Sequence, residues 1–156
     1  MIKKIKYLII LLFLTSCGYS PIYEVNQKTN FNLDIIKYSG DKKIGREIEK
    51  GLEKFKNKET NNSFNVNFTS LKKQEIVTKD KKGDPSSFKI TIEIDLNLES
   101  KTGGENFSKK FVKETTFDSM DNKFELDQYI NKIEKNMIFK VLQDINIFLG
   151  IIGNDI

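Results

Sequence analysis

Apolar and polar side chains alternate with a two-residue period along several stretches of this chain. The clearest run extends from Phe88 to Glu99, where every second residue is Phe, Ile or Leu. Such alternation is typical of a sheet with one buried face and one face in water. The pattern predicts four strands, at about 31–38, 64–70, 88–99 and 107–117.

The second of these strands is the least regular. Its alternation slips at Ser70-Leu71 and apolar residues return only at Ile76 and Val77, so we expect a bulge or a strand end there. Composition predicts turns at Lys81–Pro85 and at Lys101–Gly104. The second of these turns makes a hairpin of the last two strands.

Two other stretches repeat their apolar residues every three or four positions, which indicates helices. The first carries Ile44, Ile48, Leu52 and Phe55 on one face, after a turn at Ser39–Asp41 that can cap it. The second runs from about Asn122 to Leu149. The order β-α-β-β-β-α predicts an α+β two-layer sandwich, in which two helices cover one face of a four-stranded, mainly antiparallel sheet.

The first sixteen residues have the layout of a lipoprotein signal peptide. Three lysines precede an apolar run from Tyr7 to Leu14, which is far shorter than the roughly 20 residues that span a bilayer. The run ends in Leu14-Thr15-Ser16-Cys17, a lipobox, whose cysteine is the only one in the chain. We therefore predict that Cys17 carries a diacylglyceryl group on sulfur and becomes the acylated first residue of a membrane-anchored protein.

This interpretation divides the chain into a signal peptide, 1–16, a lipidated tether, 17–30, and a single α+β periplasmic domain, 31–156. Three of the 26 basic residues belong to the signal peptide, so the mature chain carries 23 of them against 22 acidic residues. A charge this close to zero gives no support to nucleic-acid binding. We also expect no helix of the mature domain to span the membrane, because polar and charged residues interrupt its most apolar stretch, Met137–Ile152.

The residues of the common catalytic centres are missing. The chain has no histidine and its one cysteine is assigned to lipid, which removes Ser-His-Asp and Cys-His catalysis and the usual zinc sites. Ser70–Lys73 and Lys101–Gly103 match two elements of penicillin-recognising enzymes, but the third element is absent and Ser70 falls in a strand pattern. We expect a protein that is not an enzyme and uses no cofactor.

Lysines gather in three places. The clusters are Lys72 and Lys73; Lys79, Lys81 and Lys82; and Lys109, Lys110 and Lys113. They are either solvated charges interleaved with acids or a surface for an anionic lipid headgroup. The last helix has more apolar residues than one buried face needs. These residues are either buried against the sheet or in contact with a partner.

The segment Cys17-Gly18-Tyr19-Ser20-Pro21-Ile22-Tyr23 resembles the opening of mature LPS-assembly lipoproteins, the LptE family. Its alphaproteobacterial members commonly begin C-G-[FY]-x-P-[LIV]-Y. The size, the order of elements and the long final helix are also similar to that family. Residue 18 is Gly and not Asp, which resembles a lipoprotein directed to the outer membrane, with its domain facing the periplasm.

The resemblance implies a subunit of the outer-membrane LPS translocon. In that family the lipoprotein plugs a large LptD-like β-barrel, helps it assemble and contacts LPS on its way to the outer leaflet. The expected partners are therefore this barrel, LPS, and the membrane through acylated Cys17. No contact residue carries over by motif, and Lys79, Lys81 and Lys82 are candidates for LPS phosphates on their charge alone.

Two other classes share the anchor and the size. A lipoprotein that regulates a peptidoglycan synthase usually has a long disordered tether, whereas the predicted tether before Phe31 has only about fourteen residues, Cys17 included. A subunit of a phospholipid-transport complex fits the same pattern. The sequence leaves both open beside the LPS-assembly interpretation.

Overall fold

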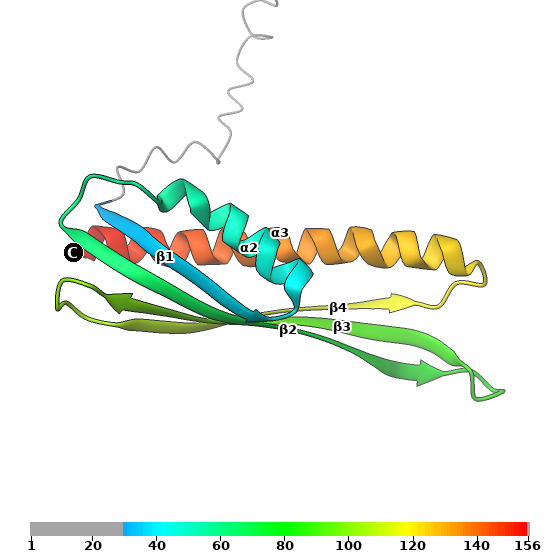
Figure 1. Ribbon diagram of the computed structural model, residues 1–156. Helices are drawn as coiled ribbons and strands as arrows, with labels where there is room; N and C mark the ends of the chain where they lie inside the picture. Colours follow the sequence, from blue (N-terminus) through cyan, green and yellow to red (C-terminus); the bar gives the residue numbers. More distant parts are fainter. Residues whose placement is uncertain (1–29, 156) are drawn as a thin grey trace, which may run out of the picture.

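The computed structural model describes residues 30–155 of the 156-residue chain. The predicted signal peptide and lipidated Cys17 lie outside the described residues. The elements are β1 (Phe31–Gly40), α2 (Lys42–Leu52), the 3₁₀ turn η1 (Glu53–Phe55), β2 (Asn62–Lys79), β3 (Pro85–Ser100), β4 (Phe107–Asp118) and α3 (Lys123–Asp155). The strands form one sheet in the order β1-β2-β3-β4, and both helices lie on the same face of it (Figure 1). β1 runs parallel to β2, and the other two pairs are antiparallel. The predicted fold class and order of elements are confirmed.

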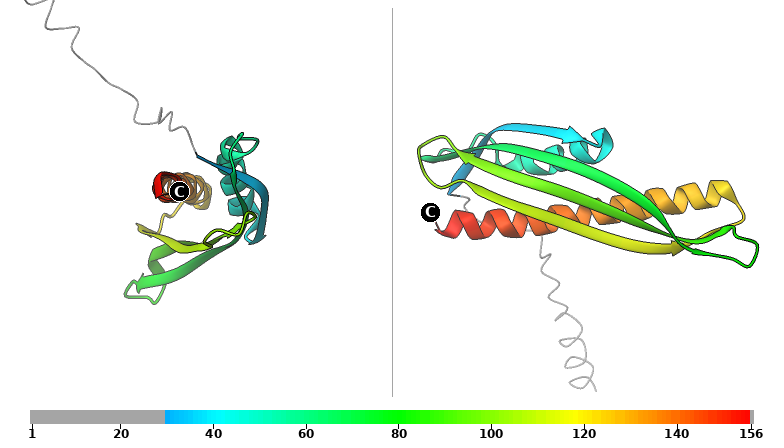
Figure 2. Two further views of the ribbon diagram at one scale, coloured as in Figure 1. Left: turned by 90° about the vertical axis from the view of Figure 1, so that its left-hand side faces the viewer. Right: turned by 90° about the horizontal axis from the view of Figure 1, so that it is seen from below.

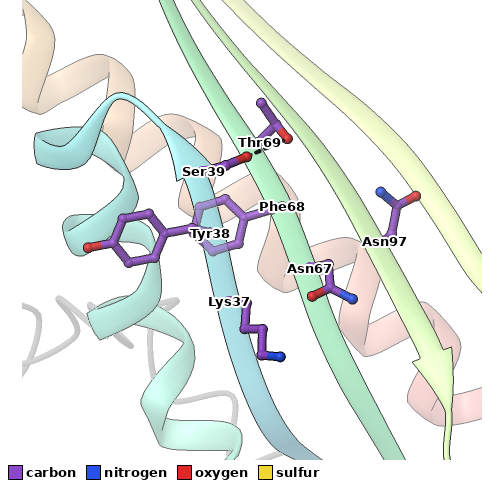
Figure 3. A pocket seen from close by; sticks show the side chains of 7 residues that line it. All are labelled: Lys37, Tyr38, Ser39, Asn67, Phe68, Thr69 and Asn97. Carbon is purple, nitrogen blue, oxygen red and sulfur yellow. Dashed lines mark hydrogen bonds between the residues drawn. The ribbon is translucent and has the colours of Figure 1, made fainter.

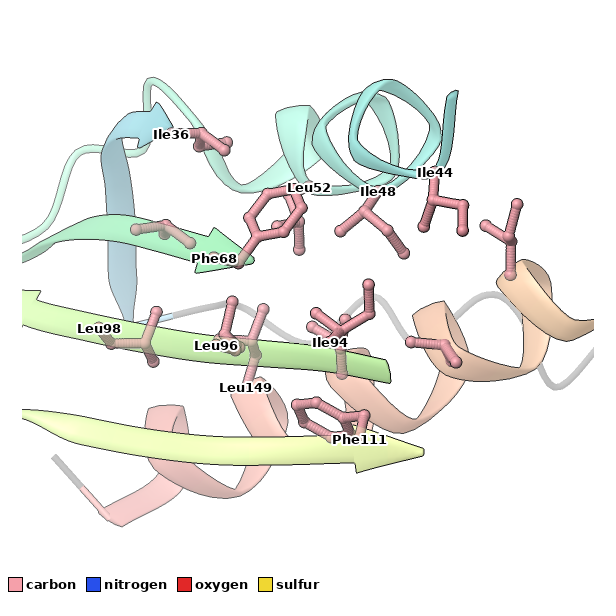
Figure 4. Close-up of a cluster of buried hydrophobic side chains, with 14 of the residues drawn as sticks. Ile36, Ile44, Ile48, Leu52, Phe68, Ile94, Leu96, Leu98, Phe111 and Leu149 are labelled. Carbon is pink, nitrogen blue, oxygen red and sulfur yellow. The ribbon is translucent and has the colours of Figure 1, made fainter. Parts of the chain in front are cut away.

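The core lies between this sheet and the two helices. The inward residues of β3 are almost completely buried, as the alternation predicts; they are Ile90, Ile92, Ile94, Leu96 and Leu98. α2 covers them with Ile44, Ile48 and Leu52 (Figure 4), and α3 adds Val141 and Ile145. Burial of each such side chain stabilises the fold by roughly 1.5–3 kcal/mol, so this layer holds the sheet and the helices together.

The end of β1 is fixed to the middle of β2. The Ser70 carbonyl accepts the Asp41 N–H at 2.9 Å, and the buried Ser70 hydroxyl donates to the Ser39 and Asp41 carbonyls. Asp41 then caps α2, since its carboxylate accepts the N–H groups of Lys43 and Ile44. Gly40 has φ +88°, and a side chain there would overlap the Ser70 carbonyl oxygen. Glycine at this position therefore lets β1 end and α2 begin directly against β2.

The expected bulge or strand end at Ser70-Leu71 is wrong. β2 continues for 18 residues, and its ladder with β3 is regular from Phe64 to Ile76. What ends at Ser70 is the neighbouring strand β1. The apolar alternation stops there because β2 leaves the covered part of the sheet, and the next inward position is the charged Lys72. The actual irregularities flank Thr78.

A buried carboxylate joins β2 to both helices. Glu134 of α3 is only 2% exposed, and its Oε2 lies 3.0 Å from Lys43 Nζ of α2 and 3.2 Å from Lys72 Nζ of β2. Lys43 also donates to the Asn131 amide oxygen. Both lysines remain partly exposed, so water shares the solvation of their charges while the carboxylate depends on them. This ion triad fixes α3 relative to α2 and β2.

α3 is longer than predicted, because the apolar spacing continues past Leu149 to Ile152. Its inward side packs on the sheet, but Phe139, Ile147 and Ile151 are 47%, 64% and 54% exposed. Among the described residues, α3 is the one helix long and apolar enough to cross a membrane, a test that the core helix of a water-soluble domain also passes. Of the two interpretations of its apolar residues, burial against the sheet therefore holds for the inward side of α3.

Substitution of Gly40 tests the β1–α2 junction. Gly40→Ala should lower the free energy of unfolding by more than about 2 kcal/mol, because it adds a steric overlap to the cost of a left-handed backbone. Gly83→Ala is the matched control, since Gly83 has φ +90° with open space around it and should lose only about 1 kcal/mol. Urea denaturation measures both. Equal losses would contradict the proposed contact with Ser70.

Substitution of Glu134 tests the ion triad. Glu134→Gln keeps the shape but removes the charge that Lys43 and Lys72 share, and should lower the free energy of unfolding by about 1–3 kcal/mol. Glu47→Gln, at an exposed position of α2, should change it by less than about 0.5 kcal/mol. The two variants are compared by urea denaturation. A Glu134→Gln protein as stable as the parent would show that the triad adds nothing to the fold.

Candidate functional site

The domain has two dissimilar ends. At the proximal end the chain enters β1, and the ring of Phe31 lies against Gly153 near the end of α3. At the distal end are the β2–β3 turn and the start of α3 (Figures 1 and 2). The 33 residues of α3 span about 50 Å. The distal end is therefore about that far from the point where the segment bearing Cys17 joins the domain.

The distal turn presents the three lysines that the sequence singled out. Asp80 shapes this turn, since its carboxylate accepts the backbone N–H groups of Lys82 and Asp84 at 2.8 and 2.9 Å. Lys79, Lys81 and Lys82 are all exposed, and none of them forms an ion pair within residues 30–155. The structure thus leaves all three of these predicted site residues exposed, with no carboxylate of the described part of the chain within ion-pairing distance.

The cluster on β2 differs in this respect. Lys72 belongs to the ion triad with Glu134, and Lys73 lies 3.4 Å from Glu93 of β3. Lys110 approaches the same carboxylate to 2.9 Å. Hydrogen bonds from Lys110 and then from Lys73 lower the pKa of Glu93, which keeps this acid ionised. These lysines are the solvated, partnered charges of the first interpretation.

The lysines of β4 are partnered as well. Lys113 pairs with Asp144 of α3 at 2.6 Å. The Lys109 ammonium lies 4.9 Å from the centre of the Phe148 ring, a cation–π contact that helps to hold α3 on β4. Of the three lysine clusters, the one at the distal turn therefore keeps the most charge available for an anionic ligand.

Large apolar side chains are exposed at the same end. Ile76 and Val77, just before the turn, are 50% and 51% exposed. Phe124, in the first turn of α3, is 70% exposed, and Met120 precedes it in the β4–α3 connection. We call these residues and Lys79, Lys81 and Lys82 the distal patch. Ammonium groups and exposed apolar side chains at one end of the domain suit a ligand that has both anionic groups and hydrocarbon chains.

The outer face of the sheet has a different character. A shallow hollow there is lined by Lys37, Ser39, Asn67, Thr69 and Asn97, with Tyr38 and Phe68 beneath (Figure 3). Ser39 and Thr69 share a hydrogen bond of 3.0 Å, and the Tyr38 and Phe68 rings stack at 5.6 Å. This face is wet and polar, as the alternation predicts. Within residues 30–155 no group of three or more His, Cys, Asp or Glu side chains is placed to hold a metal ion.

Sequence reasoning missed two parts of this arrangement. Phe124 fell outside the predicted apolar spacing of α3, although a phenylalanine among polar residues at a helix start is a visible signal. Glu134 stands between Ile130 and Ile138 at helical spacing, and Lys72 occupies an inward position of β2. Charges of opposite sign at two core-facing positions could have predicted their pairing.

Several solved bacterial lipoproteins have a similar fold. Rare lipoprotein B from Shewanella oneidensis aligns with a TM-score of 0.52 and 10% identity, over 72% of this chain and 94% of that one. An uncharacterized lipoprotein B from Nitrosomonas europaea aligns with a TM-score of 0.53 and 9% identity, over 79% and 86%. A minor lipoprotein from Acinetobacter baumannii gives 0.51 and 8%, over 78% and 93%. At these identities the likeness is one of fold. The sequence matches no protein-family profile and no curated protein.

Proposed function

We propose that this protein is an outer-membrane lipoprotein of the LPS translocon, anchored through Cys17, that plugs and helps assemble an LptD-like β-barrel and contacts LPS during delivery. The proposal makes it a non-enzymatic subunit. The observation that carries it is the distal end, where the turn lysines form no ion pair within residues 30–155 and where Ile76, Val77 and Phe124 are exposed. LPS has phosphates that the lysines can bind and acyl chains that the exposed apolar side chains can contact. The fold shared with bacterial lipoproteins and the lipobox support the same proposal.

The position of the patch agrees with this role. The tether of residues 18–30 reaches at most about 45 Å, and it joins the domain at Phe31, at the proximal end. The distal patch stands about 50 Å farther on along α3. A domain held by its proximal end thus presents its charged turn far from its own anchor. There the turn can contact an amphiphile that arrives through the periplasm.

Charge reversal at the distal turn tests the LPS contact. Lys81→Glu with Lys82→Glu should reduce LPS capture by immobilised protein at least about fivefold, because each lysine lost removes a charge-assisted contact with phosphate. Both side chains are exposed, so the circular dichroism spectrum and the unfolding midpoint should not change. Lys50→Glu with Lys58→Glu makes the same change in net charge on exposed residues of α2 and of the loop that precedes β2. Its capture should equal that of the parent. Equal LPS capture by the parent and both double variants would show that the distal lysines are ordinary solvated charges with no role in LPS binding.

Substitution of Cys17 tests the anchor. Cys17→Ala, made behind a cleavable secretory signal peptide, should leave the domain in the soluble periplasmic fraction, because no acyl chain then holds it. The parent with its own lipobox should sediment with the membranes. Ultracentrifugation followed by immunoblotting compares the two. A Cys17→Ala protein that still sediments would show that another element, such as α3, binds the membrane.

A further inference from the structure

β2 has an unpaired edge along its distal half. β1 pairs with it only from Asn62 to Ser70, whereas β3 pairs with it as far as Lys79. No residue of the described part of the chain pairs with the other side of β2 beyond Ser70. The side chains along this half are mostly exposed. An open strand edge presents backbone donors and acceptors that another strand can satisfy.

The backbone groups that face this edge can be identified. The Ser70 carbonyl points to the β1 side, because it accepts the Asp41 N–H there. Successive residues of a strand point their backbone groups to opposite sides, so Lys72, Gln74 and Ile76 share the orientation of Ser70. The ladder with β3 is regular through Ile76. We call the segment Lys72–Ile76 the free edge. Its outward-facing backbone groups belong to Lys72, Gln74 and Ile76, each of which can donate and accept one hydrogen bond.

The side chains of the free edge are complementary to a second copy of themselves. In an antiparallel pair centred on Gln74, Lys73 stands opposite Glu75 of the other copy, and Glu75 opposite its Lys73. Leu71 and Val77, which are 43% and 51% exposed, also stand opposite each other twice. The pairs at Gln74 and at Lys72 with Ile76 are the hydrogen-bonded ones. Opposite charges and apolar pairs directly across two strands stabilise their association.

Other symmetric registers lack this match. Residues that stand opposite each other must point to the same face of the sheet, so the two-fold axis must pass through a residue and not between two. A centre at Glu75 places two carboxylates opposite each other, and a centre at Lys73 places two ammonium groups opposite each other. Like charges in these positions are destabilising. The charge pattern therefore selects the register centred on Gln74.

The local ion pairs continue the same pattern. Lys73 already lies 3.4 Å from Glu93, and Glu75 lies 3.5 Å from Lys89, both across the β2–β3 ladder. In the pair each charge would lie between two opposite ones. Lys72 keeps its contact with Glu134 on the inner face. An inward charge close to a strand edge discourages indiscriminate pairing, so the edge favours a matched partner over random association.

We propose that two copies of this protein associate through the free edge, antiparallel and centred on Gln74, so that their sheets become continuous. This self-association does not depend on the proposed LPS contact, because it uses the edge of β2 and not the lysines of the distal turn. It concerns copies of the protein that are not seated in the β-barrel of the proposed function. An extended strand of a different protein would use the same backbone groups but would not need the Lys73–Glu75 match. The need for the Lys73–Glu75 match therefore distinguishes a second copy of this protein from a strand of a different protein.

Disulfide formation at the symmetry axis tests the pairing. In a hydrogen-bonded antiparallel pair the two Gln74 Cα atoms would lie about 5.5 Å apart, which a disulfide can bridge. Gln74→Cys in the full lipidated chain, purified in mild detergent and oxidised, should give a disulfide-linked dimer on non-reducing gels. Asn97→Cys, exposed on the central strand β3, is the control and should stay monomeric, as should the parent with Cys17 alone.

Charge steering tests the register. In the Gln74→Cys background, Lys73→Glu makes an edge of two acids and Glu75→Lys an edge of two bases. Each alone should give at least about tenfold less dimer, since like charges oppose each other twice. A mixture of the two should restore the dimer, which also shows that both variants are folded.

Three results would overturn the proposal. These are the absence of a Gln74→Cys dimer, equal dimer from Asn97→Cys, and dimer formation insensitive to the charge changes. Cross-linking of Gln74→Cys in native membranes to a different protein, with no homodimer, would also overturn it and assign the free edge to that partner.

Discussion

The arrangement of the domain depends on the junction at which Gly40 meets Ser70. The positive φ of Gly40 and the hydrogen bonds between Ser70, Ser39 and Asp41 end β1 halfway along β2 and start α2 there. Because α2 then runs back over β1 and β2, it seals the proximal half of the sheet (Figure 1). The same junction leaves the distal half of β2 paired with β3 on one side and, within residues 30–155, with no strand on the other. One backbone constraint thus separates a packed half from an exposed one.

In the proposed function the two halves of the domain have different roles. The proximal half holds most of the buried isoleucines and leucines, and it receives the chain from the predicted anchor beside Gly153. The distal half carries a turn whose lysines form no ion pair with the described residues 30–155, and exposed side chains such as Phe124 that contribute little to the core. In the proposed function, stability and ligand contact therefore belong to different regions, so charges at the turn can change without loss of the core. The ion triad at Glu134 connects the regions by fixing α3 across both.

The sequence predicted this fold wherever one face of an element is buried. The strict alternation in β3 and the spacing of Ile44, Ile48 and Leu52 each have a single solution, which the structure confirms. Prediction failed at Ser70-Leu71, because a strand that loses a neighbour and a strand that ends give the same loss of apolar alternation. For the site, charge alone singled out Lys79, Lys81 and Lys82. Their contrast with the other lysines arises from cross-strand partners such as Glu93 and Asp144, which no local pattern reveals. The anchoring prediction at Cys17 lies outside the described residues.

The most direct test of the central claim is the identity of the proteins bound to this one in its native membrane. The lipidated protein would be purified from native membranes in mild detergent, and the proteins recovered with it would be identified and quantified by mass spectrometry. The proposed function predicts a stoichiometric outer-membrane β-barrel of the LPS-transport type, with LPS in the same preparation. Stoichiometric recovery of a peptidoglycan synthase or a phospholipid transporter, without such a barrel, would contradict it.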